Sequence, residues 1–325
     1  MRARFRYLAF AVALAAPALV SPTQGQTYPD RPVRLVVPFP AGGGVDTMAR
    51  VLGQKLSEFL KQPVLIEHRP GAGGNIGADA VAKAAPDGYT VLLTVNTLSS
   101  SPAIYKKLSY DPLKDLVPIT QISASQFVLT GSPKLEANTV QEMIALAKAR
   151  PGSLNYGSSG VGAPLHFQAE MLKFATGIDI AHIPYRGDAP MLTALLSGDV
   201  HFAFMPQTTG APQVLNKQLK GFAVTGRKRQ PTLPDLPTLM EVGIRGLEDG
   251  SWYGLFVPAG TPPAIAQKLQ QETAKTVAMA EIRDRLISWG QEPLGTTSQE
   301  FEAFFKADVA KFIRIVEAAR IPKLD

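Results

Sequence analysis

The chain alternates short apolar runs with longer stretches in which apolar residues recur every three or four positions. The run Val33–Val37 predicts a buried strand, and the apolar residues over 48–60 have the spacing of an amphipathic helix. The same alternation continues along the chain and predicts an α/β fold with mainly parallel sheets. Further strands are predicted at 64–67, 90–95, 127–130, 153–156, 180–183, 200–205 and 221–224.

Capping residues mark where several helices begin and end. Asp188 is expected to be the N-cap of one helix, and Gly198 to follow its last turn. Pro164 has the fixed φ that suits a first helical position. Thr297 and Glu300 have the spacing of a capping box, which predicts a last helix that runs to about residue 320.

The length of 325 residues favours two domains. Two strand-like segments, 122–130 and 251–257, are expected to cross between them. Such crossings place a middle domain inside a split outer domain. We therefore predict one lobe from residues 27–126 plus 246–325 and a second lobe from residues 127–245.

The first residues predict export. A basic start with three arginines is followed by an apolar run over 7–20, which is typical of a secretory signal peptide spanning residues 1–26. The chain contains no cysteine, which excludes disulfides and a lipid-modified N-terminal cysteine. We expect a soluble periplasmic protein that is not lipid-anchored.

The net charge of the chain and the distribution of its basic residues do not indicate a nucleic-acid partner. The net charge is +6, and the three arginines of the predicted leader account for half of it. Basic residues form no dense stripe interleaved with aromatic ones, so we expect no nucleic-acid partner. The histidines number four and lack the spacing of metal ligands, and we predict neither a metal site nor a cofactor.

The segment 38–46, which reads Pro-Phe-Pro-Ala-Gly-Gly-Gly-Val-Asp, is the first candidate site. It joins a predicted strand to a predicted helix, and its glycines leave backbone N–H groups open to close approach. A helix N-terminus stabilises anions, so the segment predicts a cradle for a carboxylate or phosphate. The alternative is a tight turn with Asp46 or Thr47 as N-cap. The candidate ligand residues on this lobe are Phe39, Ala41, Gly42 and Gly43, with Asn96 or Thr97 nearby.

A second glycine-rich loop, 157–162, also follows a predicted strand and precedes a helix. It repeats the logic of the first cradle and adds two hydroxyls that could donate to an anion, the alternative being a flexible connection. After the next strand, Tyr185 could line a cleft and Arg186 could meet a carboxylate; the alternatives are packing for Tyr185 and solvent exposure for Arg186. Trp252 is expected to pack around the domain crossing or to reach the pocket. The candidate ligand residues on this lobe are Ser158, Ser159, Gly160, Gly162, Tyr185, Arg186 and Gln207.

Enzyme motifs fail in detail. A nucleophile elbow centred on Ser159 would need glycine where Val161 stands, and a dinucleotide fingerprint would need glycine at Ile76. His166 and Glu170 are expected to brace a helix surface, and the other histidines are expected to be scattered. We therefore predict no catalytic residue.

Several motifs in order resemble one family. They resemble the Bug (TctC-type) periplasmic solute-binding proteins, which serve tripartite tricarboxylate transporters, and the similarity spans residues 28–325. The matching segments are 38–46, 69–77 with 86–90, 155–162 with His166 and Glu170, 182–187, and 256–262.

The resemblance implies a type II periplasmic-binding-protein fold, with two α/β lobes, a hinge and an interlobe ligand cleft. It implies a receptor that captures a small carboxylate, held largely by backbone amides and waters. Met205, Pro206, Gln207 and Thr208 stand where many members have an acid suited to a ligand's ammonium. Their presence favours a dicarboxylate, a tricarboxylate or an aromatic acid over an amino acid.

The expected partners are the ligand and membrane transporter subunits, with a sensor kinase as a further candidate and a monomer as the expected state. Two rival functions remain open at this point. One is a ligand sensor for a signalling partner, and the other is an exported hydrolase or lyase on the same fold.

Overall fold

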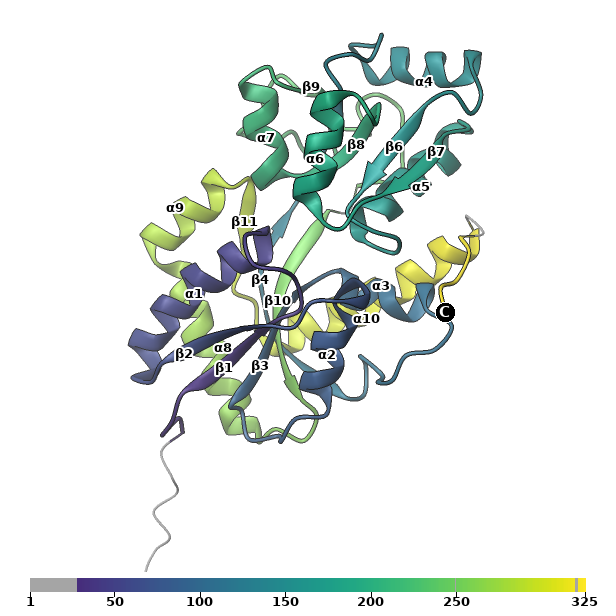
Figure 1. Cartoon of the computed structure of the whole chain (residues 1–325). Coiled ribbons are helices and arrows are strands. Elements are labelled where there is room, and N and C mark those ends of the chain that lie inside the picture. Colours follow the sequence, from purple (N-terminus) through teal and green to yellow (C-terminus); the bar gives the residue numbers. More distant parts are fainter. Residues whose placement is uncertain (1–27, 249, 319–320) are drawn as a thin grey trace, which may run out of the picture.

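The computed structural model describes residues 28–248, 250–318 and 321–325. The predicted signal peptide, residues 1–26, and the predicted end of the last helix near residue 320 lie outside these described residues. The described chain forms two sheets, each covered by helices and each the centre of one lobe (Figure 1).

The first sheet has the strand order β11-β4-β10-β3-β1-β2. Its strands are β1 (Val33–Val37), β2 (Val64–His68), β3 (Thr90–Val95), β4 (Leu116–Ser125), β10 (Ser251–Pro258) and β11 (Gln291–Pro293). Around it lie α1 (Gly44–Leu60), the short 3-10 helix η1 (Ala72–Gly74), α2 (Asn75–Ala82), α3 (Thr97–Ile104), α8 (Pro263–Ala278), α9 (Ala280–Ser288) and α10 (Ser298–Ala318).

Alternation of side chains along the strands divides the core of this lobe into two layers. Leu35 and Leu93 pack in the layer that contains α1 and α8, whereas their neighbour Leu92 packs in the layer with α2 and α10. Trp252 belongs to the second layer, and its indole Nε1 donates to Asp308 at 2.9 Å. Trp252 therefore packs in the core and does not reach a cleft.

The second sheet has the order β7-β6-β8-β5-β9. Its strands are β5 (Phe127–Gly131), β6 (Asn155–Ser158), β7 (Ala181–Pro184), β8 (Phe202–Pro206) and β9 (Lys220–Val224). Its helices are α4 (Val140–Ala149), α5 (Pro164–Thr176), α6 (Asp188–Ser197) and α7 (Gln207–Leu215).

Two neighbouring segments carry the chain between the sheets. The strand β4 ends at Ser125 and β5 begins at Phe127, so the outward crossing is almost one continuous strand. The strand β10 returns beside it, with Ser251 paired to Ser125 (Figure 1). A Cβ atom on Gly250 would lie 1.8 Å from the carbonyl oxygen of Ser125. Only glycine allows the two crossings to come this close.

The alternation of strands and helices is confirmed, but two expectations about local structure are wrong. The sheets are mixed, because β10 pairs antiparallel with β3 and β4, and β5 pairs antiparallel with β8 and β9. The strand β10 enters the first lobe directly beside β4, which leaves it, so these two strands pair antiparallel. Asp188 is not an N-cap; Gly187 takes that place, and no side chain caps the helix. The capping box is confirmed, since the Glu300 N–H donates to Thr297 Oγ1 at 3.2 Å.

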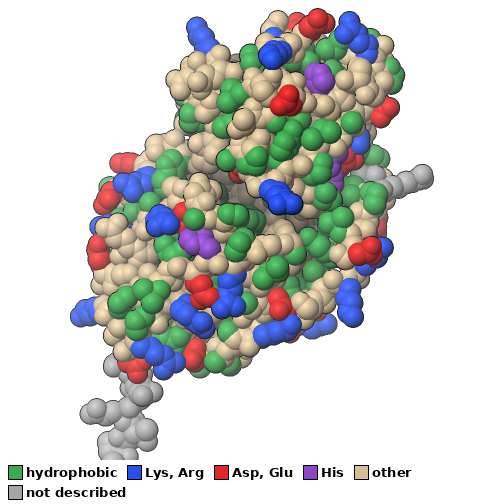
Figure 2. Space-filling model, in the orientation of Figure 1, with side chains coloured by type: hydrophobic (Ala, Val, Ile, Leu, Met, Phe, Trp, Pro, Cys, Tyr) green, Lys and Arg blue, Asp and Glu red, His purple; other side chains and the backbone are tan. Residues whose placement is uncertain are grey.

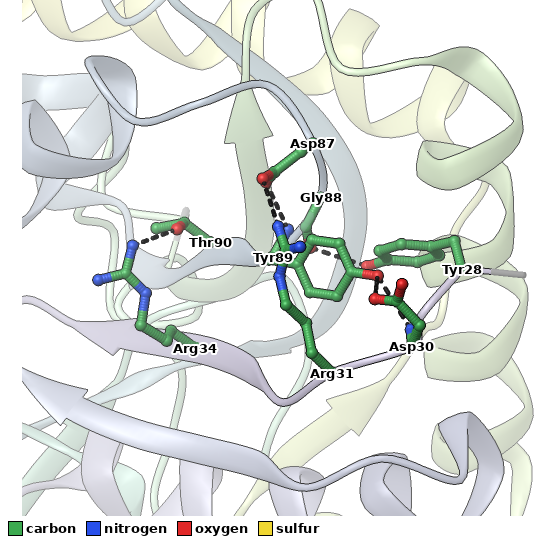
Figure 3. A network of polar contacts seen from close by, with 8 residues as sticks. All are labelled: Tyr28, Asp30, Arg31, Arg34, Asp87, Gly88, Tyr89 and Thr90. Atoms are coloured by element: carbon green, nitrogen blue, oxygen red, sulfur yellow. Dashed lines mark hydrogen bonds and ion pairs between the residues drawn. The ribbon is translucent and has the colours of Figure 1, made fainter. Parts of the chain in front are cut away.

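A polar network ties the start of the described chain to the loop before β3 (Figure 3). Arg31 forms an ion pair with Asp87 at 3.0 Å and lies 3.9 Å over the ring of Tyr89. The Tyr89 hydroxyl donates to Asp30 Oδ1 at 2.6 Å. These groups lie at the amino ends of β1 and β3 and satisfy one another, so the network stabilises the edge of the sheet that lies away from the candidate site.

Within the described residues, no helix has both the length and the apolar character needed to cross a bilayer.

Candidate functional site

The predicted ligand residues all follow the carboxyl ends of strands. The loop 38–43 follows β1, Asn96 follows β3, and the loop 158–163 begins at the end of β6. In open α/β sheets this edge is where ligands bind. The two lobes present these edges to each other: a Cβ atom on Gly44 of α1 would lie 3.8 Å from Thr208 Oγ1 of α7. Figure 2 shows a hollow between the lobes, bordered by apolar side chains and reached by a basic side chain at its rim.

The first loop leads into the N-terminus of α1 without a capping side chain. Gly43 is the N-cap and makes no side-chain cap hydrogen bond. Ala41, Gly42 and Gly43 are exposed, and a Cβ atom on Gly42 would meet nothing within 4 Å. The first-turn N–H groups of a helix have no intrahelical acceptor. The loop therefore offers exposed donors at the positive end of a helix.

Asp46 holds this loop in place. Its carboxylate, 3 % exposed, accepts from the Gly42 N–H at 2.8 Å and from Arg50 Nε at 3.0 Å, and it lies 2.8 Å from His68 Nε2. Burial tends to raise the pKa of Asp46, but the hydrogen bonds from Gly42, Arg50 and His68 outweigh it and lower that pKa. One expected donor, the Gly42 N–H, is thus used inside the loop, and Asp46 acts from within the helix instead of capping it.

Other candidates of the first lobe have packing partners. The Phe39 ring contacts the loop before α2, with Cζ 3.3 Å from the position of a Cβ on Gly74. The Asn96 side chain binds the return crossing, because it donates to the Gly250 carbonyl at 3.4 Å and accepts from Ser251 Oγ at 3.0 Å. Thr97 is the buried first residue of α3. Asn96 therefore links the candidate site to the crossing strands.

The second loop is also fixed by internal hydrogen bonds. Ser158 Oγ lies 2.6 Å from His182 Nε2 and accepts from the Gly160 N–H at 3.2 Å. The Gly162 N–H donates to His166 Nδ1 at 3.2 Å. The expectation that both serine hydroxyls face an anion needs correction, because Ser158 is completely buried and its hydroxyl is used within the loop.

A stack of three rings underlies this loop. His182 lies between Tyr156 and His166, at ring distances of 4.8 and 4.2 Å. Tyr156 donates its hydroxyl to Glu170 Oε1 at 2.6 Å and His166 is buried, so the expected surface pairing of His166 with Glu170 is wrong. The other three histidines do lie apart, on or beside β2, β7 and β8. Burial and the neighbouring His166 lower the pKa of His182 to about 4. His182 is therefore neutral near pH 7, and the Ser158 hydroxyl beside it is buried.

The two residues that follow β7, Tyr185 and Arg186, differ in their interactions. Tyr185 is half-buried, and its N–H donates to the Ser158 carbonyl at 2.9 Å. Arg186 is exposed, and among the described residues no ion pair reaches it. Gly187 donates its N–H to the Ser159 carbonyl at 3.2 Å, which places the following Asp188 beside Ser159.

Asp188 of the second lobe and Tyr253 of the first are close enough to interact electrostatically, and neither residue was predicted to belong to the site. Burial raises the pKa of the Asp188 carboxyl, which interacts with the Ser159 hydroxyl. Burial and the nearby Asp188 raise the pKa of Tyr253. The Tyr253 hydroxyl lies 2.8 Å from the position of a Cβ on Gly44. The acidic first residue of α6 was the only available signal, and capping explained it equally well.

The start of α7 contributes buried polar atoms that lack partners. Gln207 is 1 % exposed and packs against Gly290 of the first lobe. Within the described residues, Gln207 Nε2 and Thr208 Oγ1 have no hydrogen-bond partner. Buried polar atoms normally bind protein, water or ligand. Thr208, beside Gly44 and Tyr253, is therefore a further candidate for ligand contact.

Two α/β lobes, joined by paired crossing strands and facing each other with their strand-end loops, define the class of periplasmic binding proteins. The periplasmic binding protein BugD has this fold, with a TM-score of 0.85 and 34% identity over 91% of this chain and 100% of BugD. The type II two-lobe prediction is confirmed. The chain belongs to the TctC family, described as the tripartite tricarboxylate transporter family receptor, whose model matches residues 48–321.

Curated relatives cover almost the whole chain. A UPF0065 protein in the gbd 5' region of Cupriavidus necator is 37% identical over 99% of this chain and 97% of its own length. Protein BugT of Bordetella pertussis is 32% identical over 93% of this chain and 94% of its own length. The predicted resemblance to Bug proteins is thereby confirmed.

Two similar solved structures contain bound acids. An R. palustris protein solved with adipate has a TM-score of 0.87 and 34% identity over 91% of this chain and 100% of that one. MatC from Rhodopseudomonas palustris, solved with bound malate, has a TM-score of 0.83 and 29% identity over 89% of this chain and 100% of MatC.

Proposed function

We propose that this protein is a periplasmic receptor that binds a small carboxylate between its lobes and delivers it to a tripartite tricarboxylate-type transporter. Family membership supports the transporter, and the relatives solved with adipate and malate support the carboxylate. The observation that carries the proposal is the uncapped, exposed loop 41–43 standing opposite the partnerless Thr208 hydroxyl of the other lobe. Export through residues 1–26 is part of the proposal.

The lobes are proposed to divide as residues 27–126 plus 246–325 and residues 127–245. The strands of the first sheet come from both parts of the first lobe, and those of the second sheet lie within 127–224. The segments near 126 and 250 would then act as the hinge, and the lobes would close on the ligand.

Backbone donors supply most of the affinity in this proposal. Phe39, Ala41 and Gly43 would meet the ligand from the first lobe, with Gly42 and Thr97 shaping that side. From the second lobe Ser159, Gly160, Tyr185 and Arg186 would meet it, while Ser158, Gly162, Asn96 and Gln207 would hold the site in shape. Hydrogen bonds to a charged group contribute about 1.5–3 kcal/mol each. Three or four of them match the roughly 8 kcal/mol of micromolar binding.

The ligand is proposed to leave unchanged. Ser158 and His182 resemble a nucleophile and its base, but the buried hydroxyl cannot reach a substrate. One chain supplies both halves of the site, which supports action as a monomer. A sensor kinase is a second candidate partner, recognising the same closed form.

The test places a charge in the first loop without straining it. Gly43 has φ −84, and a Cβ there would lie no closer than 3.8 Å to any atom outside its chain neighbours. Gly43→Asp adds an N-cap carboxylate, which maintains or raises the melting temperature. The same charge repels an anionic ligand, so we expect calorimetry to show a dissociation constant for a dicarboxylate raised by about 30-fold or more.

Gly43→Asn is the matched control, because it caps the helix and fills the same space without charge. It should weaken binding far less than Gly43→Asp. Equal affinity of Gly43→Asp and the unaltered protein would contradict the loop assignment. If the unaltered protein binds no di-, tri- or aromatic carboxylate, the proposed function itself is wrong.

A further inference from the structure

One acidic residue of the second lobe lies beside the loop that the proposal assigns to an anion. Asp188 is the first residue of α6 and follows the carboxyl end of β7. The hydrogen bond between the Gly187 N–H and the Ser159 carbonyl, 3.2 Å long, holds it against the second ligand loop. A Cβ atom on Gly187 would meet nothing within 4 Å, so the chain here borders open space. Asp188 therefore stands at the wall of the cleft.

No cation of the described chain balances this carboxylate. Ion pairs link many of the acidic residues to lysine or arginine, but among the described residues none involves Asp188. It interacts with the Ser159 hydroxyl of its own lobe and, electrostatically, with Tyr253 of the other lobe. The surrounding protein of both lobes disfavours the ionised form. A half-buried carboxylate in these surroundings lacks a strong donor.

The place opposite Asp188 also belongs to the first ligand loop. The Tyr253 hydroxyl lies 2.8 Å, and Thr208 Oγ1 3.8 Å, from the position of a Cβ on Gly44. A small molecule whose carboxylate reaches the N-terminus of α1 would therefore have the rest of its atoms near Asp188. Beside ionised Asp188, a second ligand carboxylate would meet a like charge, whereas a ligand hydroxyl or ammonium would find an acceptor and would favour the ionised form.

We propose that Asp188 selects ligands that carry a hydrogen-bond donor, a hydroxyl or an ammonium, in addition to their carboxylate. This inference rests on the proposed function and narrows its substrate class. It also revises the expectation drawn from residues 205–208: an acid is absent after β8, but α6 supplies one after β7, which is separated from β8 by β6 in the sheet. Amino acids and hydroxy acids thereby become favoured ligands over simple dicarboxylates.

The test uses sets of acids that differ only in the donor. Succinate, malate and aspartate share one skeleton, as do glutarate, 2-hydroxyglutarate and glutamate, and benzoate is paired with 4-hydroxybenzoate. Thermal-shift screening finds the set that binds, and calorimetry at pH 7.5 gives each dissociation constant. A charge-assisted hydrogen bond predicts that a donor-bearing member binds about 10- to 100-fold more tightly than the plain acid.

Asp188→Asn removes the charge and keeps the size, and it should reduce that preference to about threefold or less. Asp188→Ser should do the same, which guards against a folding defect in one variant. Asp199→Asn is the matched control, since this exposed carboxylate follows the other end of α6 and binds Ser197 Oγ. It should keep the full preference. The ratio of the dissociation constants for malate and aspartate shows whether the site prefers a hydroxyl or an ammonium as the donor.

Each outcome decides one point. The inference is supported if the unaltered protein and Asp199→Asn prefer the donor-bearing acid and both Asp188 variants lose that preference. Binding of the plain acid as tightly as its donor-bearing partner overturns the inference and leaves the proposed function standing. Preference that survives in Asp188→Asn and Asp188→Ser also overturns it. If no acid of the panel binds, the proposed function and this inference fail together.

Discussion

Buried side chains fix both ligand loops from behind. Asp46 binds the Gly42 N–H of the first loop, while Ser158 and His166 bind the Gly160 and Gly162 N–H groups of the second. A loop that is held before the ligand arrives loses less conformational freedom on binding. Because these N–H groups already have acceptors within the protein, fewer backbone donors remain for the ligand. The N–H groups at the helix N-termini must then supply a larger share of the binding free energy.

His182 predicts how stability responds to acid. Its pKa in the folded chain is about 4, below the ordinary value of 6.5, because burial and His166 disfavour the charged ring; Glu170 opposes this and Lys173 adds to it. The unfolded chain therefore binds more protons between these two pH values, and stability falls as the pH is lowered from 6.5 to 4. The loss from this residue is up to about 3 kcal/mol.

His182→Gln tests this expectation, because glutamine can still bond Ser158 but does not titrate. Urea unfolding measured from pH 8 to pH 4 should show a shallower loss of stability in the variant. Two parallel pH profiles would show that His182 does not carry the effect.

At the scale of elements, the paired crossings are the most constrained part of the fold. The register between β10 and β4 shifts next to Tyr253, and Gly250 approaches Ser125 immediately before the pairing begins. Asn96 binds Gly250 and Ser251, so the end of β3 is coupled to the same point. If the lobes move relative to each other, the backbone at these residues would have to change conformation.

Gly250→Ala should therefore be costly. Its Cβ would lie 1.8 Å from the Ser125 carbonyl oxygen, a contact that only a backbone shift can relieve. We expect a loss of about 3 kcal/mol in the free energy of unfolding, measured by urea denaturation. Gly43→Ala is the control, with its nearest contact at 3.8 Å and an expected loss of about 1 kcal/mol or less, because alanine is a poorer N-cap than glycine. Equal stability of the two variants would contradict the tight crossing.

For the molecule as a whole, the sequence predicts the parts that depend on local pattern. Apolar runs such as Val33–Val37 locate the strands, and glycine-rich loops after them locate the cleft edge, because parallel strands bring their carboxyl ends together. The antiparallel return of β10 was missed, since the pattern within one strand says nothing about its direction. The outward crossing falls within the predicted segment 122–130, whereas the predicted segment 251–257 lies wholly within β10 of the first sheet, so the return crossing precedes it.

Contacts between residues far apart in the chain could not be predicted from the sequence. His166 and His182 meet only because β7 pairs with β6 and α5 packs over the pair. Asp188 and Tyr253 come close only because the two lobes face each other. Their spacing along the chain gives no indication of that proximity. The same limit explains why Ser158 and Ser159 looked equivalent, although one is buried and the other lies beside α6.

The most direct test of the whole account is a crystal structure of the protein grown with the carboxylate that binds it most tightly. The account predicts electron density between the lobes, with the carboxylate at the N-terminus of α1 and contacts to loop 41–43 and Ser159 together. Density held by one lobe alone, or outside the hollow between them, would contradict it.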